Sequence, residues 1–257
     1  MNLPLLRNAL PSWAAAVLWG DRRRWGLRVD EQDPCWEQWQ AIYADFYDAT
    51  QRGGVGLVVN DAGYRIMARL DLEGKTVLEI GSGDIRHTAF WNGTPREYLL
   101  AEVQESMMQK AEAKLASLEV PTRSIRLQRG DPLPLADGSV DVILAFYSLE
   151  HIYPLAPYLK ELDRVLRPGG RLAGAIPAEG GLAWGLGRSI TSRRWFKKHT
   201  RIDPDKIICW EHPNFGDEII RGLDQVLVRE QVGFWPFPWV PSLDFNLLIR
   251  FAYRKME

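Results

Sequence analysis

The sequence has few cysteines and almost no net charge, and each shortage excludes a class of protein. Its 257 residues contain two cysteines, Cys35 and Cys209, which lie too far apart to form a metal-binding pair. We therefore predict no metal site and a reducing, cytoplasmic setting. The formal net charge of −1 gives no overall attraction to nucleic acid or to an anionic membrane.

The sequence also lacks an apolar run of the ~18 residues that a membrane-spanning helix needs. The nearest approach is Ala9–Gly20, which Asp21 and three arginines follow. A signal peptide carries its charge before the apolar run, so we expect a helix packed on the domain. The alternative is an interfacial anchor over residues 9–28, whose arginines would meet lipid headgroups and hold the chain at the inner face of the membrane.

The stretch Lys75–Phe90, KTVLEIGSGDIRHTAF, carries the first functional signal. It predicts a short buried strand, a turn at Gly81–Gly83 and a helix over about Asp84–Trp91. Glycines let a ligand approach the backbone, and a helix start offers free N–H groups. A nucleotide-type ligand site is therefore expected at this turn.

Acidic residues follow the next two predicted strands at matching places. Glu102 stands 19 residues beyond Gly83, where dinucleotide folds bind a ribose diol, and Asp131 follows the third strand. Strands that alternate with helices indicate parallel βαβ units, whose ligands bind at the carboxyl ends of the strands. Glu79, Glu102 and Asp131 should therefore converge on one edge of the sheet.

Two competing nucleotide sites fit less well. A nicotinamide site requires G-x-G-x-x-G, but Arg86 occupies the third glycine position of that pattern. A phosphate-binding loop is excluded, because the sequence contains no G-x-x-x-x-G-K-[ST].

Four ordered motifs between about Leu72 and Pro177 make a specific resemblance. They read VLEIGSG, LLAEV, LQRGDPLPLADGSVDVILAFYSLEHI and LKELDRVLRPGGRLAGAIP. They resemble the class I S-adenosylmethionine-dependent methyltransferases, in particular the small-molecule subgroup called methyltransferase type 11. The resemblance implies a Rossmann-like α/β fold with helices on both faces of a seven-stranded sheet, in order 3-2-1-4-5-7-6, with strand 7 antiparallel. The glycine loop departs from the family at Ile85, where a third glycine is usual; we expect cofactor binding to survive with a reshaped helix start.

The resemblance also implies the residues that hold the cofactor, S-adenosylmethionine, and its product S-adenosylhomocysteine. Gly81 and Gly83 would pass close to the methionine part, Glu79 would orient the loop, and Glu102 would bind the ribose hydroxyls. The full implied set is Glu79, Gly81, Ser82, Gly83, Glu102, Val103, Asp131, Pro132, Phe146 and Tyr147.

We divide the single expected domain, 1–257, into four parts. Residues 1–70 form an N-terminal helical cap, 71–177 the cofactor-binding core, 178–216 an inserted cap after strand five, and 217–257 the last helix and strands. No acidic residue occurs between Glu179 and Asp203, and the arginines and tryptophans of that interval indicate either a solvated basic face or a contact with an anionic substrate. The candidate substrate contacts in the two caps are Tyr43, Tyr47, Arg188, Arg194 and His212.

These patterns predict a small-molecule methyltransferase, with O-methylation of a hydroxyl on a sugar or glycan precursor as the first interpretation. His151, in SLEHI after strand four, is the candidate general base, because its ordinary pKa near ~6.5 suits proton removal at neutral pH. A purely structural hydrogen bond at this junction is the alternative role for His151. The alternative functions are methylation of a lipid, quinone or aromatic natural product at a membrane surface, and non-catalytic cofactor binding. Near-neutral charge and the lack of a base-flipping motif argue against a nucleic-acid substrate.

Overall fold

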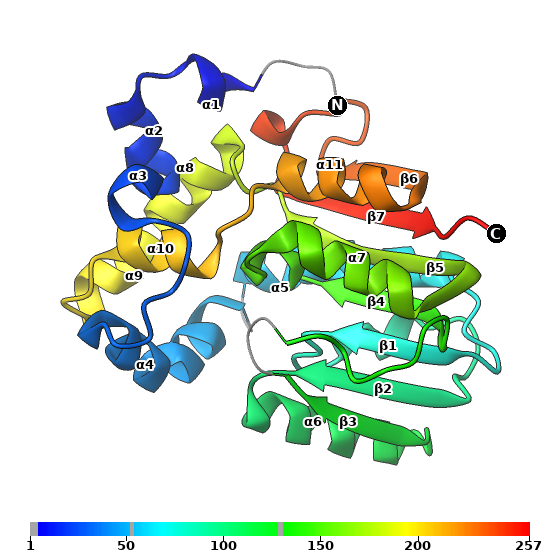
Figure 1. Cartoon of the computed structure of the whole chain (residues 1–257). Coiled ribbons are helices and arrows are strands. Elements are labelled where there is room, and N and C mark those ends of the chain that lie inside the picture. Colours follow the sequence, from blue (N-terminus) through cyan, green and yellow to red (C-terminus); the bar gives the residue numbers. More distant parts are fainter. Residues whose placement is uncertain (1–4, 52–53, 128–130) are drawn as a thin grey trace.

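The fold is a seven-stranded mixed sheet with helices on both faces and a helical cap at one end (Figure 1). The computed structural model describes residues 5–51, 54–127 and 131–257. The strands are β1 Thr76–Ile80, β2 Glu97–Glu102, β3 Thr122–Arg126, β4 Val140–Phe146, β5 Leu166–Pro177, β6 Val228–Trp235 and β7 Leu248–Arg254. Their order is β3-β2-β1-β4-β5-β7-β6, and β7 runs antiparallel to β5 and β6. The predicted topology is confirmed.

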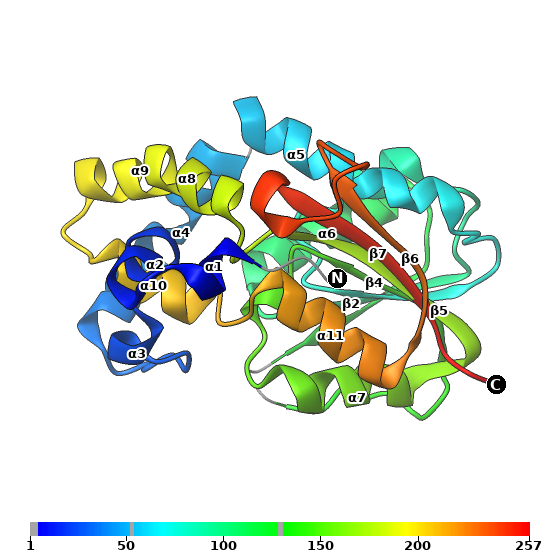
Figure 2. The same ribbon diagram turned by 90° about the horizontal axis from the view of Figure 1, so that it is seen from above.

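Alternation along the strands builds one hydrophobic core on each face of the sheet. Leu78 and Ile80 of β1 pack with α7 Leu155–Val165 and α11 Gly216–Val226. Val77, one position away, packs on the opposite face with α6 Glu105–Ser117 and η1 Arg65–Arg69. Figure 2 shows α7 and α11 together on one side of the sheet and α5 Gly54–Tyr64 on the other. Because side chains alternate with a period of two, the odd-numbered β1 residue Glu79 lies on the second face.

The cap gathers segments that lie far apart in the sequence. Its N-terminal part contains α1 Leu6–Ala9, α2 Ser12–Trp19, α3 Arg22–Trp25 and α4 Pro34–Gln51. Its inserted part contains α8 Leu182–Ile190, α9 Ser192–His199 and α10 Pro204–Glu211. In Figure 1 the arrowheads of β1 and β2 point toward this cap, so it faces the carboxyl ends of the parallel strands. The cap and the sheet edge therefore enclose the region where ligands bind in such folds.

One predicted element is wrong. The helix expected over Asp84–Trp91 is a short 3-10 helix, η2 Arg86–Phe90, and no α-helix starts at Asp84. Ile85 precedes η2 in the left-handed conformation, with φ +40°, and this conformation interrupts an α-helix. The turn therefore does not present the N-terminal N–H groups of an α-helix to a ligand.

Candidate active site

The glycine turn after β1 lies tightly against the loop after β4. Gly81 and Gly83 have φ angles of +67° and +54°, which favour glycine. A Cβ atom on Gly81 would lie 2.8 Å from the Cβ of Ser148. Any other residue would push the two loops apart, so the turn brings the ends of β1 and β4 together.

Glu102 is fixed at the end of β2 by backbone donors. Its Oε1 accepts hydrogen bonds from the N–H groups of Val103 at 2.8 Å and Gln104 at 2.9 Å, and its Oε2 accepts from Gly83 N–H at 3.3 Å. Burial raises the pKa of Glu102, and these backbone donors oppose that rise. Glu102 thus joins the glycine turn to β2 and presents a carboxylate to the adjoining cleft.

Glu79 is buried and uses both carboxylate oxygens within the protein. Tyr98 OH donates to Oε2 at 2.6 Å, and His87 Nε2 lies 2.8 Å from Oε1. Trp91 Nε1 donates to His87 Nδ1 at 3.0 Å, which leaves His87 Nε2 to donate to Glu79. Burial, followed by the charge of Glu79, raises the pKa of Tyr98. Glu79 therefore anchors η2 beneath the glycine turn.

Three buried side-chain oxygens near this turn have no hydrogen-bond partner among the described residues. They are Ser82 Oγ, Ser148 Oγ and Glu150 Oε2, and all three residues line the same cleft. Native proteins rarely leave buried polar atoms unpaired, so such atoms in a cleft indicate a polar ligand. The two serine oxygens beside the glycine turn therefore fit the amino and carboxylate groups of S-adenosylmethionine, and the Glu150 oxygen remains for a second ligand in the same cleft.

All ten residues of the predicted cofactor set line this cleft, which has a volume of about 1910 Å³. Asp131 and Pro132 lie exposed at its edge, whereas Phe146 is buried. The hydroxyl of Tyr147 donates to the backbone carbonyls of Val59 at 3.1 Å and Asn60 at 3.3 Å, so α5 holds it. Burial raises the pKa of Tyr147. Because its hydroxyl is already hydrogen-bonded, Tyr147 offers a ligand its aromatic ring.

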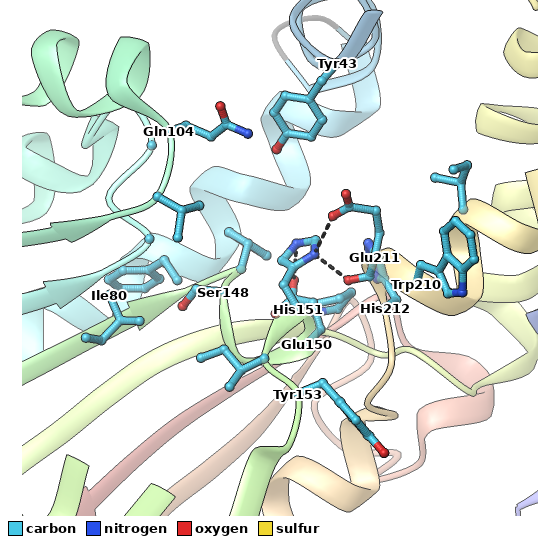
Figure 3. A pocket seen from close by; sticks show the side chains of 18 of the residues that line it. Tyr43, Ile80, Gln104, Ser148, Glu150, His151, Tyr153, Trp210, Glu211 and His212 are labelled. Carbon is cyan, nitrogen blue, oxygen red and sulfur yellow. Dashed lines mark hydrogen bonds and ion pairs between the residues drawn. The ribbon is translucent and has the colours of Figure 1, made fainter. Parts of the chain in front are cut away.

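His151 lies between two carboxylates, Glu150 and Glu211, where the sheet side of the cleft meets the cap (Figure 3). Its Nδ1 is 2.5 Å from the backbone oxygen of Glu211 and 3.2 Å from Glu211 Oε2, and its Nε2 is 4.0 Å from Glu150 Oε1. Burial lowers its pKa, but Glu211 and Glu150 outweigh burial and raise it to about 9. At neutral pH the ring is an imidazolium, which has no lone pair for a proton, and this charge state opposes the predicted role of general base.

His212 is next to His151 but has the opposite environment. The two ring centroids are 4.7 Å apart, and His212 Nδ1 lies 3.0 Å from Glu179 Oε2. Burial is the main reason why the pKa of His212 falls to about 4. Arg188 makes a bidentate ion pair with Glu179. Burial would raise the pKa of Glu179, but Arg188 and His212 outweigh burial and hold it well below its usual range.

The remaining candidates fall in different places. Tyr43 lines the cleft opposite the sheet edge, whereas Arg194 is exposed on α9 and is not among the lining residues. The side chain of Tyr47 lies outside the described residues. Sequence reasoning missed Glu211 and Trp39, whose Nε1 donates to Glu211 Oε1 at 2.7 Å. In the sequence, the only signal for Glu211 was that it precedes His212. Its contact with Trp39 could not be foreseen, because α4 and α10 meet only in the folded cap.

In residues 5–51, 54–127 and 131–257 no group of three or more His, Cys, Asp or Glu side chains is arranged to hold a metal ion. No helix in the same ranges has the length and apolar character needed to cross a membrane.

Comparison with known proteins identifies the core of the chain. Residues 78–174 match the family described as "Methyltransferase domain". The C-methyltransferase UbiE of ubiquinone and menaquinone biosynthesis from Klebsiella pneumoniae is 30% identical over 103 residues, which are 38% of this chain and 41% of that protein. The chain thus aligns with about two fifths of the length of this relative.

Solved structures share the fold at low sequence identity. An S-adenosylmethionine-dependent methyltransferase from Mesorhizobium loti is similar with a TM-score of 0.52 and 15% identity, over 76% of this chain and 99% of that chain. The [4+2]-cyclase SpnF is similar with a TM-score of 0.56 and 13% identity, over 86% of this chain and 94% of that chain. These likenesses concern the fold, which also supports chemistry other than methyl transfer.

Proposed function

We propose that this chain, which belongs to the class I S-adenosylmethionine-dependent methyltransferases, transfers a methyl group to a small molecule bound between the sheet edge and the cap. The observation that carries the proposal is that Ser82 Oγ, Ser148 Oγ and Glu150 Oε2 have no hydrogen-bond partner among the described residues and that these residues line the same cleft as Glu102. The cofactor, bound beside the glycine turn, would satisfy the two serines, and a hydroxyl of the acceptor would satisfy Glu150.

In the proposed mechanism the protein mainly positions two reactants. S-adenosylmethionine, when bound, supplies a methyl carbon that a positive sulfur already activates. Gly81 and Gly83 admit its methionine part, the Glu102 carboxylate binds the ribose hydroxyls, and Asp131 with Pro132 holds the adenine. The cap keeps water from the acceptor and aligns its nucleophile with the methyl group, so proximity supplies most of the rate enhancement.

We propose a neutral sugar or glycan precursor as the acceptor and one of its hydroxyls as the methylated atom. Carboxylates line the cleft on both the sheet side and the cap side: Asp30, Glu31, Asp84, Glu102, Asp131, Glu150, Glu161 and Glu211. Arg188, which also lines the cleft, is already paired with Glu179. This charge balance disfavours phosphorylated acceptors, whereas carboxylates beside Trp39, Tyr43 and Trp195 suit the hydroxyls and apolar face of a sugar ring.

Methylation of a quinone-like ring is the second candidate. It is favoured by the 30% identity to UbiE, whose printed name gives ubiquinone and menaquinone biosynthesis, and by the aromatic lining of the cleft. A cofactor-binding protein without methyl transfer is the third, since SpnF shares the fold and is named a cyclase.

Membrane contact through residues 9–28 is a further part of the proposal. On α2, Trp13 is 72% exposed and Val17 is 60% exposed, at the helical spacing that places them on one face. Arg23 and Arg24, on α3, are exposed as well. Sedimentation with vesicles of phosphatidylglycerol should remove wild type from solution but not Trp13→Ser/Val17→Ser, and equal sedimentation of both would contradict membrane contact.

The direct test uses S-adenosylmethionine with a tritiated methyl group and three acceptor classes: neutral methyl glycosides, nucleotide sugars and hydroquinones. We expect label in an acid-stable ether on the glycosides and none on the nucleotide sugars. Label on a hydroquinone ring carbon would instead support the second candidate. Glu102→Ala serves as the control for cofactor-dependent transfer, and wild-type protein that labels none of the three classes would contradict the proposal.

A further inference from the structure

Glu150 lines the cleft and combines deep burial with a side-chain oxygen that has no partner among the described residues. It belongs to η3 Leu149–His151, directly after β4, and is only 2% exposed. Its Oε2 has no hydrogen-bond partner among the described residues, although Glu150 lines the cleft. A buried carboxylate oxygen in this state carries a desolvation cost that a hydroxyl of a ligand would relieve.

The neighbouring His151 is held in place by groups other than Glu150. Glu211 accepts from Nδ1, both through its backbone oxygen at 2.5 Å and through Oε2 at 3.2 Å, and Trp39 in turn fixes the other oxygen of Glu211. The Nε2 of His151 is left facing Glu150 Oε1 at 4.0 Å. Figure 3 shows this order, with His151 between Glu211 and Glu150.

We propose that Glu150 accepts the proton of the acceptor hydroxyl, and that His151, fixed by Glu211, is the positioning residue that holds Glu150 beside the acceptor. The inference deepens the proposed function and rests on it. In the transfer step the acceptor oxygen bonds to the methyl carbon, and the electron pair of the broken carbon–sulfur bond stays on sulfur. The hydroxyl proton passes to the Glu150 carboxylate.

The charges around Glu150 suit a group that must exist as a carboxylate and then hold a proton. Burial raises its pKa and His151 opposes the rise, with a result of about 7. Glu179 raises this pKa further and Arg188 lowers it. A base is most effective when its pKa is near the working pH.

The elements packed on η3 bring few other charges that remain unpaired. From α10, Glu211 is occupied by His151 and Trp39. From α11, Asp217 pairs with Arg7 and Arg221, and Glu218 accepts from the N–H of Phe215. Beyond β5, Glu179 pairs with Arg188 and His212. His151 is therefore the cation that responds most directly to the charge of Glu150.

The first test needs no acceptor. The chain has four histidines, so their C2 protons can be followed by NMR across a pH titration of the full chain, and His151→Gln identifies the signal of His151. We expect a His151 midpoint well above 6.5 that falls by about one pH unit, a tenfold loss of proton affinity, in Glu150→Gln. Glu105→Gln, which removes an exposed carboxylate of α6, should leave it unchanged. An unchanged midpoint in Glu150→Gln would overturn the pairing and with it the inference.

The second test measures methyl transfer to the neutral glycosides. We expect Glu150→Gln to lower kcat by about 100-fold, the lower range of general base catalysis, with an unchanged Kd for S-adenosylhomocysteine. Glu150→Asp should recover part of the rate. His151→Gln should change the pH dependence of kcat and should affect KM less than kcat. A Glu150→Gln enzyme within about threefold of wild type would reject Glu150 as the base. Wild type that methylates no glycoside would instead contradict the proposed function, while the titration still judges the Glu150–His151 pair.

Discussion

The two sides of the cleft treat buried charge in opposite ways. On the sheet side, Glu102 is held by backbone N–H groups, and Ser82, Ser148 and Glu150 keep oxygens without partners among the described residues. On the cap side, the Glu179 carboxylate accepts hydrogen bonds from Arg188 and Trp184 and lies against His212. Unpaired polar atoms are tolerated where a ligand completes them, whereas a saturated ion pair holds structure. The sheet side therefore keeps polar groups for the cofactor, whereas the buried ion pair around Glu179 stabilises the cap.

Two histidines mark the boundary between these regions. His151 and His212 are in edge-to-face contact, yet the pKa of the first is raised to about 9 and that of the second is lowered to about 4. The difference arises because His151 lies between two carboxylates, whereas burial dominates at His212 and its carboxylate partner Glu179 is already paired with Arg188. Of these two rings, which both line the cleft, His151 is therefore the one that carries a positive charge at neutral pH.

The largest expected effect breaks the cap. Arg188→Gln leaves the Glu179 carboxylate buried without its ionic partner, so the free energy of unfolding should fall by about 3–5 kcal/mol. Urea denaturation followed by tryptophan fluorescence measures the change. The matched control is Arg194→Gln on the exposed face of α9, which should change stability by less than about 0.5 kcal/mol. Equal effects of the two substitutions would contradict the claim that the Arg188–Glu179 pair stabilises the cap.

The next effect concerns the sheet side, where binding rather than stability should suffer. Glu102→Ala removes a charged acceptor of ligand hydroxyls, so we expect a 10- to 100-fold weaker Kd for S-adenosylhomocysteine, equivalent to about 1.5–3 kcal/mol. Isothermal calorimetry measures this Kd. Glu105→Ala, three residues further on and exposed, should retain wild-type affinity. Comparable losses in both variants would contradict a specific role for Glu102.

A smaller effect follows from the charge on His151. Its folded-state pKa of about 9 exceeds the ordinary value of 6.5, so its stabilising contribution is complete below pH 6.5 and disappears as pH rises through 9. The stability difference between wild type and His151→Gln should therefore shrink by about 1 kcal/mol from pH 6 to pH 9.5, because the ring is 34% exposed and partly screened. His199→Gln, an exposed control, should show no such trend in urea denaturation at these pH values. A difference that grows with pH would have the wrong sign.

The smallest effect tests the backbone of the glycine turn. Ile85 is 1% exposed and adopts φ +40°, a strained conformation for a β-branched residue. Both Ile85→Ala and Ile85→Gly lose the buried side chain, but only glycine is free of the left-handed strain. Urea denaturation should show Ile85→Gly to be the more stable of the two by about 1 kcal/mol. Ile66, a buried residue of the 3-10 helix η1, is the control. There Ile66→Ala should be more stable than Ile66→Gly.

The sheet side could be predicted from the sequence because strand register fixes it. Glu79 is the last residue but one of β1, the Gly81–Gly83 turn follows β1, and Glu102 ends β2. Parallel neighbours bring these strand ends to one edge. The prediction of an α-helix after the turn was wrong because Ile85 adopts a left-handed conformation. The side chain of Ile85 is buried in the core, and local helix propensity does not encode such tertiary packing. The predicted contact of Arg188 with an anionic substrate has to compete with its pair to Glu179.

The cap was harder to predict because its contacts join distant segments. Arg22 of α3 donates to the backbone oxygens of His212 and Pro213, and Trp39 of α4 reaches Glu211. No local pattern announces such pairs. The composition correctly indicated a basic, aromatic interval, but the structure pairs part of that charge internally, as with Arg193 and Asp205.

The central claim is that the sheet edge binds S-adenosylmethionine, and calorimetry of the full chain tests it most directly. S-adenosylmethionine and S-adenosylhomocysteine should each bind at one site per chain, and NAD, the cofactor of the competing interpretation of the glycine turn, should not bind. Binding of NAD with no heat from either of the other two ligands would contradict the account.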